Sequence, residues 1–224
     1  MVREHVRMEM VARRLLGSSV FQHFIEAAPG FKELAVLAFA MRSLEAKDGR
    51  PPDVDTIILD APATGHGVSL LAAPRVVAQV IEQGPFGRMA REMTAFVADP
   101  GRLGIVVVTR AEEMPAVESR ELFEMLEERV DRSPDLLVAN ALYPELPADL
   151  AKLELRPALG GVECVARPWV ERRRTNEREL ASLAASLRVP IVELPLLPID
   201  VGPRLVAALG LRLASTLDIA ADAA

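Results

Sequence analysis

Residues 55–67 constrain the fold of this chain more than any other stretch, and they read Asp-Thr-Ile-Ile-Leu-Asp-Ala-Pro-Ala-Thr-Gly-His-Gly. Residues 56–59 are apolar or β-branched and too few for a helix, so they predict a short buried strand. Asp60 follows it, and a proline and two glycines then end regular structure. The pattern places a carboxylate at the carboxyl end of a strand, where open α/β sheets bind ligands. Asp60 is suited there to hold Mg²⁺ through water, and free loop amides suit a phosphate.

The segment that begins at Asp60, Asp-Ala-Pro-Ala-Thr-Gly-His, resembles switch II of the arsenite-pump and tail-anchored-protein-targeting ATPases, whose pattern is Asp-Thr-Ala-Pro-Thr-Gly-His. The Asp, Thr, Gly and His keep the family spacing, whereas the proline is displaced by one position and Ala61 replaces the first threonine. Residues 29–34 resemble a Pro-Gly-x-x-Glu-Leu segment of the family's helical insertion. The resemblance covers most of the chain. It implies a P-loop NTPase-like fold that binds and hydrolyses ATP with Mg²⁺ and dimerises around the nucleotide.

The resemblance also assigns roles to the residues of this segment. Asp60 would be the catalytic residue that senses the γ-phosphate and the Mg²⁺, which it would hold through water. Thr64, Gly65 and His66 would lie at the nucleotide. The alternative for His66 is that it orders the loop, and the alternative for Asp60 is a simple cap of a helix or loop.

Two later segments match the family by order and context. Asn140 ends a predicted strand and would read the adenine edge, which needs one donor and one acceptor. The proline-rich loop with Pro195, Leu196 and Pro198 would cover the adenine. An Asx turn that ends the strand is the alternative for Asn140.

The chain is predicted to have a helical segment over residues 1–50 and an α/β domain over residues 51–224. The helical segment holds three predicted helices, the third over residues 31–47. In the α/β domain, further strands are predicted at residues 104–109, 135–140 and 190–194, and helices at residues 74–83, 86–97, 114–130, 169–187 and 201–217. Strands separated by helices of this length pair in parallel through right-handed crossovers. The unbroken β-branched run at residues 105–108 predicts a strand that is covered on both faces.

The phosphate-binding unit of a P-loop NTPase is absent from these 224 residues. A P-loop reads Gly-x-x-x-x-Gly-Lys-Ser/Thr, but the three lysines, Lys32, Lys47 and Lys152, are followed by Glu, Asp and Leu. The switch I aspartate of the family is also missing. The chain thus resembles the part of such an ATPase after switch I, and it is expected to be inactive alone. A truncated gene product, a mis-assigned start and a shortened paralogue are open origins, and a non-catalytic binding or scaffold protein that dimerises with a complete ATPase is the alternative function.

Composition limits the partners and the compartment. The net charge of −6 argues against a nucleic-acid partner, and the arginine run at residues 171–174 is interpreted as a solvated helix face. The single cysteine, Cys164, excludes an internal disulfide and the paired-cysteine zinc clamp of the targeting branch. The absence of a signal peptide or a membrane-spanning run predicts a cytoplasmic protein. The resemblance implies a homodimer, or a heterodimer with a P-loop-containing paralogue, and a membrane-protein client or pump as partner.

Overall fold

The computed structural model describes residues 31–46, 50–61, 65–145 and 163–217. The chain forms two compact units, Met1–Leu103 and Gly104–Ala224. The two helices predicted before residue 30 lie outside the described residues, as do Thr64 and residues 146–162. None of the described helices is long and apolar enough to cross a membrane.

The second unit is built on a parallel three-stranded sheet with the order β1-β2-β3. The strands are β1 (Val106–Arg110), β2 (Leu136–Leu142) and β3 (Ile191–Pro195), and the helices are α6 (Glu113–Val130), α8 (Glu163–Ser186) and α9 (Pro203–Thr216). The three strands lie within one or two residues of their predicted positions at each end, and helices separate them as predicted. The predicted α/β class with a parallel sheet and flanking helices is therefore confirmed.

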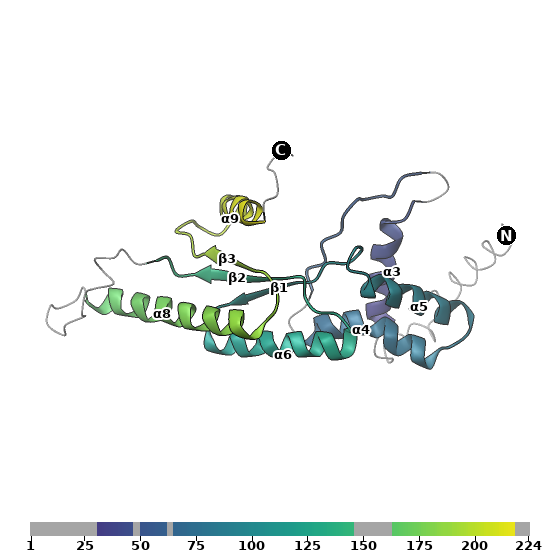
Figure 1. Ribbon diagram of the computed structural model, residues 1–224. Coiled ribbons are helices and arrows are strands. Elements are labelled where there is room, and N and C mark those ends of the chain that lie inside the picture. Colours follow the sequence, from purple (N-terminus) through teal and green to yellow (C-terminus); the bar gives the residue numbers. More distant parts are fainter. Residues whose placement is uncertain (1–30, 47–49, 62–64, 146–162, 218–224) are drawn as a thin grey trace. The chain divides into compact units, whose positions relative to one another are not determined.

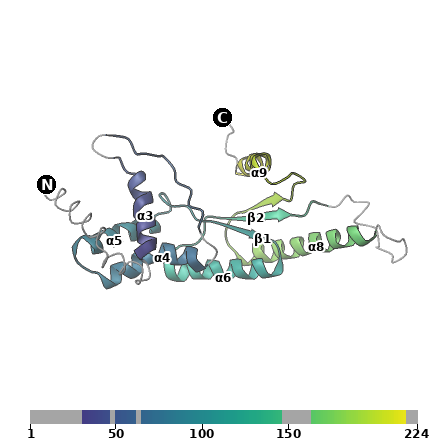
Figure 2. The same ribbon diagram turned by 180° about the vertical axis from the view of Figure 1, so that it is seen from behind.

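Helices cover both faces of this sheet. Helices α6 and α8 lie on one face and α9 lies on the other, in both views of the ribbon (Figures 1 and 2). On the first face Ala139 and Leu142 of β2 pack with Ala111, and on the second Val138 packs with Val192 of β3. Both faces of β2 are buried because it is the central strand.

One face of β1 is uncovered, which corrects the prediction that both of its faces are buried. The side chains alternate, so Val107 and Thr109 are buried whereas Val106 and Val108 are 54% and 62% exposed. The physical reason is the placement of α9, which packs over β3 and leaves the outer part of its sheet face open. The continuous apolar sequence of β1 therefore does not mean that helices cover both of its faces.

The amino ends of β1 and β2 are fixed by one carboxylate. Oδ2 of Asp135 accepts two hydrogen bonds, one from the backbone N–H of Ile105 at 2.7 Å and one from Nη2 of Arg132 at 3.1 Å. Arg132 follows the end of α6, where Asp131 adopts a left-handed conformation with φ 61°. The contact sets where each strand begins relative to the helix between them.

The first unit contributes three described helices, α3 (Phe31–Ser43), α4 (Gly65–Val80) and α5 (Gly84–Ala98), which pack against one another. The ends of α5 agree with prediction to within two residues. Helix α3 ends four residues before the predicted residue 47. Helix α4 begins at Gly65 rather than at Pro74, and Pro74 is buried inside it. The apolar residues that precede this proline bury one face of the helix, and that packing outweighs the proline's helix-breaking tendency.

The predicted strand at residues 56–59 is wrong. These residues belong to no helix or strand, and Ile58 and Leu59 are 92% and 42% exposed. A short apolar run becomes a strand only when a neighbouring strand satisfies its backbone N–H and C=O groups. Among the described residues no strand pairs with this segment, and its own β-propensity cannot replace that ladder.

Gly87 of α5 provides a test of the packing in the first unit. A Cβ there would lie 2.2 Å from the carbonyl oxygen of Ile81, so Gly87→Ala should lower the free energy of unfolding by about 1–3 kcal/mol. The matched control is Gly210→Ala in α9, where a Cβ meets nothing within 4 Å. The control should be neutral or stabilise by up to about 1 kcal/mol, since alanine is the better helix former. Urea titrations of the three chains measure this, and equal midpoints for both variants would contradict it.

Candidate functional site

The candidate site lies at the carboxyl edge of the three-stranded sheet. The strands β1, β2 and β3 end at Arg110, Leu142 and Pro195. Because the strands are parallel, these ends meet at one edge, and open α/β sheets bind their ligands there. Arg110 lies directly opposite Asn140 in the register of β1 and β2.

Asn140 occupies a β-bulge near the end of β2. Ala139 pairs with Glu193 and Leu142 pairs with Pro195, so two residues of β2, Asn140 and Ala141, lie opposite one residue of β3. Ala141 has φ 58°, a left-handed conformation that is unusual for a residue other than glycine. Bulges are common beside active sites, where they change the direction of a side chain. Here the bulge displaces Asn140 from the regular ladder with β3.

The carboxamide of Asn140 is only partly engaged by the protein. Its Oδ1 accepts the backbone N–H of Ala141 at 2.9 Å, and the residue is half-buried. This contact is local and reaches the next residue, whereas the Asx-turn alternative predicts a bond to the N–H two residues on. The Nδ2 has no hydrogen-bond partner among the residues that the structure describes. A donor, together with the second lone pair of the oxygen, is therefore available to a ligand.

The loop that follows β3 is held next to this bulge. The backbone N–H of Leu196 donates to the carbonyl oxygen of Leu142 at 2.7 Å. Pro195 is half-buried, whereas Leu196 and Pro198 are exposed. The structure thus brings Asn140 and the start of the proline-rich loop to the same edge of the sheet.

Three residues at this edge were missed by sequence reasoning, namely Tyr143, Arg173 and Asn176. Asn176 of α8 is 4% exposed, and its Oδ1 accepts the N–H of Tyr143 at 2.9 Å. Its Nδ2 donates to the carbonyl oxygen of Ala111, after β1, at 2.7 Å. One buried carboxamide thus ties the ends of two strands together.

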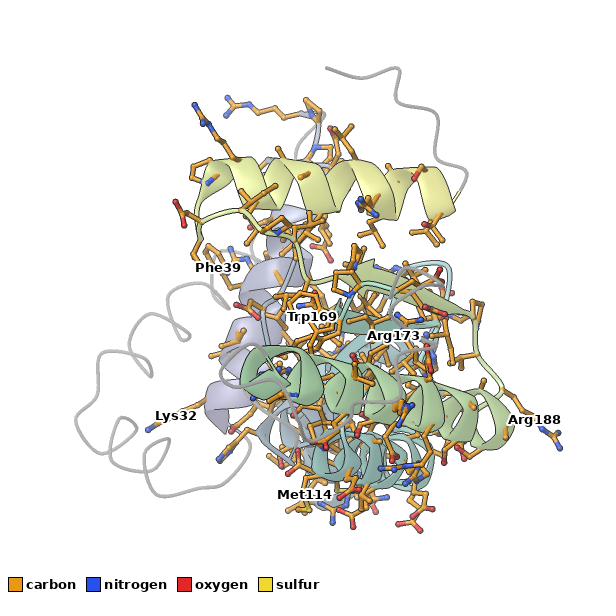
Figure 3. All side chains as sticks on the ribbon, turned by 90° about the vertical axis from the view of Figure 1, so that its left-hand side faces the viewer. Lys32, Phe39, Met114, Trp169, Arg173 and Arg188 are labelled. Carbon is orange, nitrogen blue, oxygen red and sulfur yellow. The ribbon has the colours of Figure 1, made fainter. Side chains whose placement is uncertain are left out.

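The arginine run of α8 is not a uniformly solvated face, which corrects the interpretation from sequence. The side chain of Arg173 is 14% exposed and donates to the carbonyl oxygen of Tyr143 at 2.8 Å. Arg172 bonds the hydroxyl of Tyr143, and the rings of Tyr143 and Trp169 meet edge to face at 5.1 Å. Figure 3 shows Trp169 and Arg173 on the side of α8 that faces the strands. The helical spacing of Trp169, Arg173 and Asn176 is the sequence signal that could have indicated a shared buried face.

A pocket of about 720 Å³ lies between the amino end of α6 and the adjacent face of α8. Its carboxylates are paired, because Glu112 bonds Arg110 and Glu113 bonds Arg178, both at 2.7 Å. The residues that line it are Arg110, Glu112, Glu113, Met114, Pro115, Arg172, Thr175 and Asn176. Charges of both signs share the pocket, so it does not present a single sign of charge to a ligand.

The remaining predicted site residues lie in the first unit. Asp60 is exposed in the irregular segment before α4, and Thr64 lies outside the described residues. Gly65 and His66 form the exposed first turn of α4 rather than a loop, and Ser69 donates to the carbonyl oxygen of Gly65 at 2.9 Å. Within the described ranges, no three His, Cys, Asp or Glu side chains gather as a metal-binding group.

No protein-family model matches this chain, and a search of curated proteins finds no significant match.

Proposed function

We propose that this chain binds ATP as part of a P-loop NTPase-like assembly, with the adenine between Asn140 and the loop from Pro195 to Pro198. The observation that carries the proposal is the bulge that displaces Asn140 from the β3 ladder and leaves its Nδ2 without a partner among the described residues. Leu196, whose N–H bonds the carbonyl oxygen of Leu142 two residues further along β2, is exposed and offers apolar surface to a flat base.

The chemistry of the carboxamide fits the edge of an adenine. That edge presents a ring nitrogen, which accepts, next to an amino group, which donates. The Nδ2 of Asn140 can donate to the ring nitrogen. Its Oδ1 can accept the amino group while it keeps the contact with Ala141, because an amide oxygen has two lone pairs.

The phosphate side of the proposal follows the resemblance to the arsenite-pump ATPases. Asp60 would hold Mg²⁺ through water, and Thr64, Gly65 and His66 would lie at the phosphates. The exposed carboxylate of Asp60 fits this role, since Mg²⁺ keeps several waters and takes only one or two protein carboxylates. Hydrolysis is proposed only when a partner, such as a P-loop-containing paralogue, supplies the glycine-rich loop and its lysine.

Binding of adenosine and ATP to the whole chain tests this function. The P-loop amides and lysine normally supply the affinity for phosphate, and these 224 residues contain no such loop. Adenosine and ATP should therefore bind within about threefold of each other in calorimetric titrations with Mg²⁺, because the base supplies most of the shared binding free energy. Purine riboside, which lacks the amino group that would donate to Oδ1 of Asn140, serves as the control and should bind more weakly. Absence of adenosine binding would contradict the proposal.

A scaffold protein that dimerises without catalysis is the second candidate function. The uncovered valines of β1 favour it, since Val106 and Val108 are exposed on a strand at the edge of the sheet. An edge strand of this kind presents unpaired N–H and C=O groups, and it serves as a template for pairing with another chain. The partner would be a second copy or a complete paralogue.

Analytical ultracentrifugation tests self-association through this edge. The wild-type chain should form a dimer as its concentration rises, and Val108→Lys should weaken that dimer at least about tenfold because a charge would be buried against apolar side chains. Val206→Lys on α9, where the valine is 70% exposed, is the matched control and should dimerise like wild type. A monomer at all concentrations would argue against a homodimer.

A further inference from the structure

We infer that Arg173 and Asn176 of α8 are positioning residues, which hold the backbone of Tyr143 and thereby fix the bulge that presents Asn140. The inference rests on the proposed function for its role in binding, since it concerns how the adenine-reading side chain is held. The two hydrogen bonds that hold the backbone of Tyr143 are present in the chain without ligand, so their effect can be measured separately from binding.

Both backbone polar groups of Tyr143 are bonded by the same helix. Its N–H donates to Oδ1 of Asn176 at 2.9 Å, and its carbonyl oxygen accepts Nη1 of Arg173 at 2.8 Å. The two side chains are three residues apart, so they project from the same face of α8. Tyr143 is therefore held from one side at two points.

The two holding side chains are themselves fixed. Arg173 donates to Glu177 at 2.7 Å one turn along the helix, and its side chain is 14% exposed. Asn176 is buried and donates to the carbonyl oxygen of Ala111 at 2.7 Å. Side chains locked by second contacts can set the position of a backbone, whereas freely rotating ones cannot.

The bulge needs such support because its own geometry is unfavourable. Ala141 has φ 58° without the glycine or asparagine that usually adopts this conformation. Such conformations persist only where the surrounding structure over-determines them. Tyr143 is two residues beyond Ala141, and the bond from Leu196 to the carbonyl oxygen of Leu142 holds the residue between them. Together these contacts fix the chain directly after Asn140.

The chain carries its own reporters of this arrangement. It has one tryptophan, and the ring of Trp169 lies 5.1 Å from the ring of Tyr143, so its fluorescence responds to movement of Tyr143. It also has only two asparagines, Asn140 and Asn176. Labelling with ¹⁵N-asparagine therefore gives two pairs of side-chain amide signals, and Asn140→Asp identifies which pair belongs to Asn140.

The test compares substitutions at Arg173 and Asn176 in the full chain. Arg173→Met should move the Asn140 side-chain signal, change the Trp169 emission and weaken adenosine binding about threefold to tenfold, as expected for the loss of one hydrogen bond. Arg173→Lys keeps one donor and should restore part of each change. Asn176→Asp keeps an acceptor for Tyr143, loses the donor to Ala111 and should move the same reporters. Arg174→Met, at an exposed position on the same helix, is the control and should change none of them.

Each outcome separates the inference from the proposed function. If Arg173→Met and Asn176→Asp both leave the Asn140 signal and the Trp169 emission as in wild type, the positioning role is overturned. The role is also overturned if the reporters move while the affinity for adenosine stays unchanged. If the reporters move but wild type binds no adenosine, the hold on the bulge stands and the proposed function fails.

Discussion

Replacing Asn140 with aspartate should weaken adenosine binding at least about tenfold, since one hydrogen bond is lost and a negative charge faces the ring nitrogen of the base. Aspartate keeps an oxygen that can accept the N–H of Ala141, which the asparagine accepts at 2.9 Å. The local backbone contact is thus preserved while the donor is removed. Calorimetric titration with adenosine measures the change.

The control for this substitution must separate binding from folding. Arg174→Ala, on the exposed face of α8, should bind adenosine like wild type. The urea midpoint of Asn140→Asp, followed by Trp169 fluorescence, should stay close to that of wild type. If the variant is fully folded and binds adenosine as tightly as wild type, Asn140 does not read the base.

Leu137→Ala should lower the free energy of unfolding of the second unit by about 2–5 kcal/mol, the usual cost of a cavity in a packed core. Leu137 is 0% exposed in the central strand β2, so its neighbours cannot easily close the space. The matched control is Leu211→Ala in α9, where the leucine is 67% exposed. Its effect should stay within about 0.5 kcal/mol, as for most surface substitutions.

Urea unfolding monitored by Trp169 fluorescence follows this unit, since Trp169 lies in α8. An equal loss of stability in the two leucine variants would contradict the assignment of β2 as the core of the sheet. The comparison does not depend on the proposed function.

The strands of the second unit could be predicted from sequence because each is a short apolar run between long amphipathic helices. The apolar run at residues 135–140 predicted β2 to within two residues at each end, since a strand that is buried on both faces has a continuous hydrophobic sequence. The same reasoning failed at residues 56–59, where the apolar run is similar but the described residues provide no neighbouring strand. Pairing is a tertiary property, and a short run does not reveal whether its partner is present.

The helix boundaries show a second limit. A proline was expected at the first turn of a helix, yet Pro74 lies buried inside α4, which begins at Gly65. Propensity places proline at helix starts, but the apolar face that packs on α3 and α5 extends the helix towards its amino end. As a result, Gly65 and His66 belong to a helix turn and not to the loop that the motif suggested.

The candidate site was predicted only in part. Asn140 could be selected as a candidate because a polar residue ends the predicted apolar strand, and the prolines at 195 and 198 mark a loop after the next strand. The bulge was not predictable, since Ala141 carries no sequence sign of a left-handed conformation. Arg173 and Asn176 could not be selected from the sequence of this charged helix, because long-range contacts with Tyr143 decide which of its side chains are buried.

The most direct test of the central claim is the side-chain amide spectrum of ¹⁵N-asparagine-labelled protein during an adenosine titration. The chain has two asparagines, so the spectrum contains two pairs of such signals, one pair for each carboxamide. The Asn140 signal should shift progressively and saturate, because its Nδ2 donates to the base in the complex. The Asn176 signal should move little, since that carboxamide is already bonded to Tyr143 and Ala111. An Asn140 signal that stays unchanged at saturating adenosine would contradict the account.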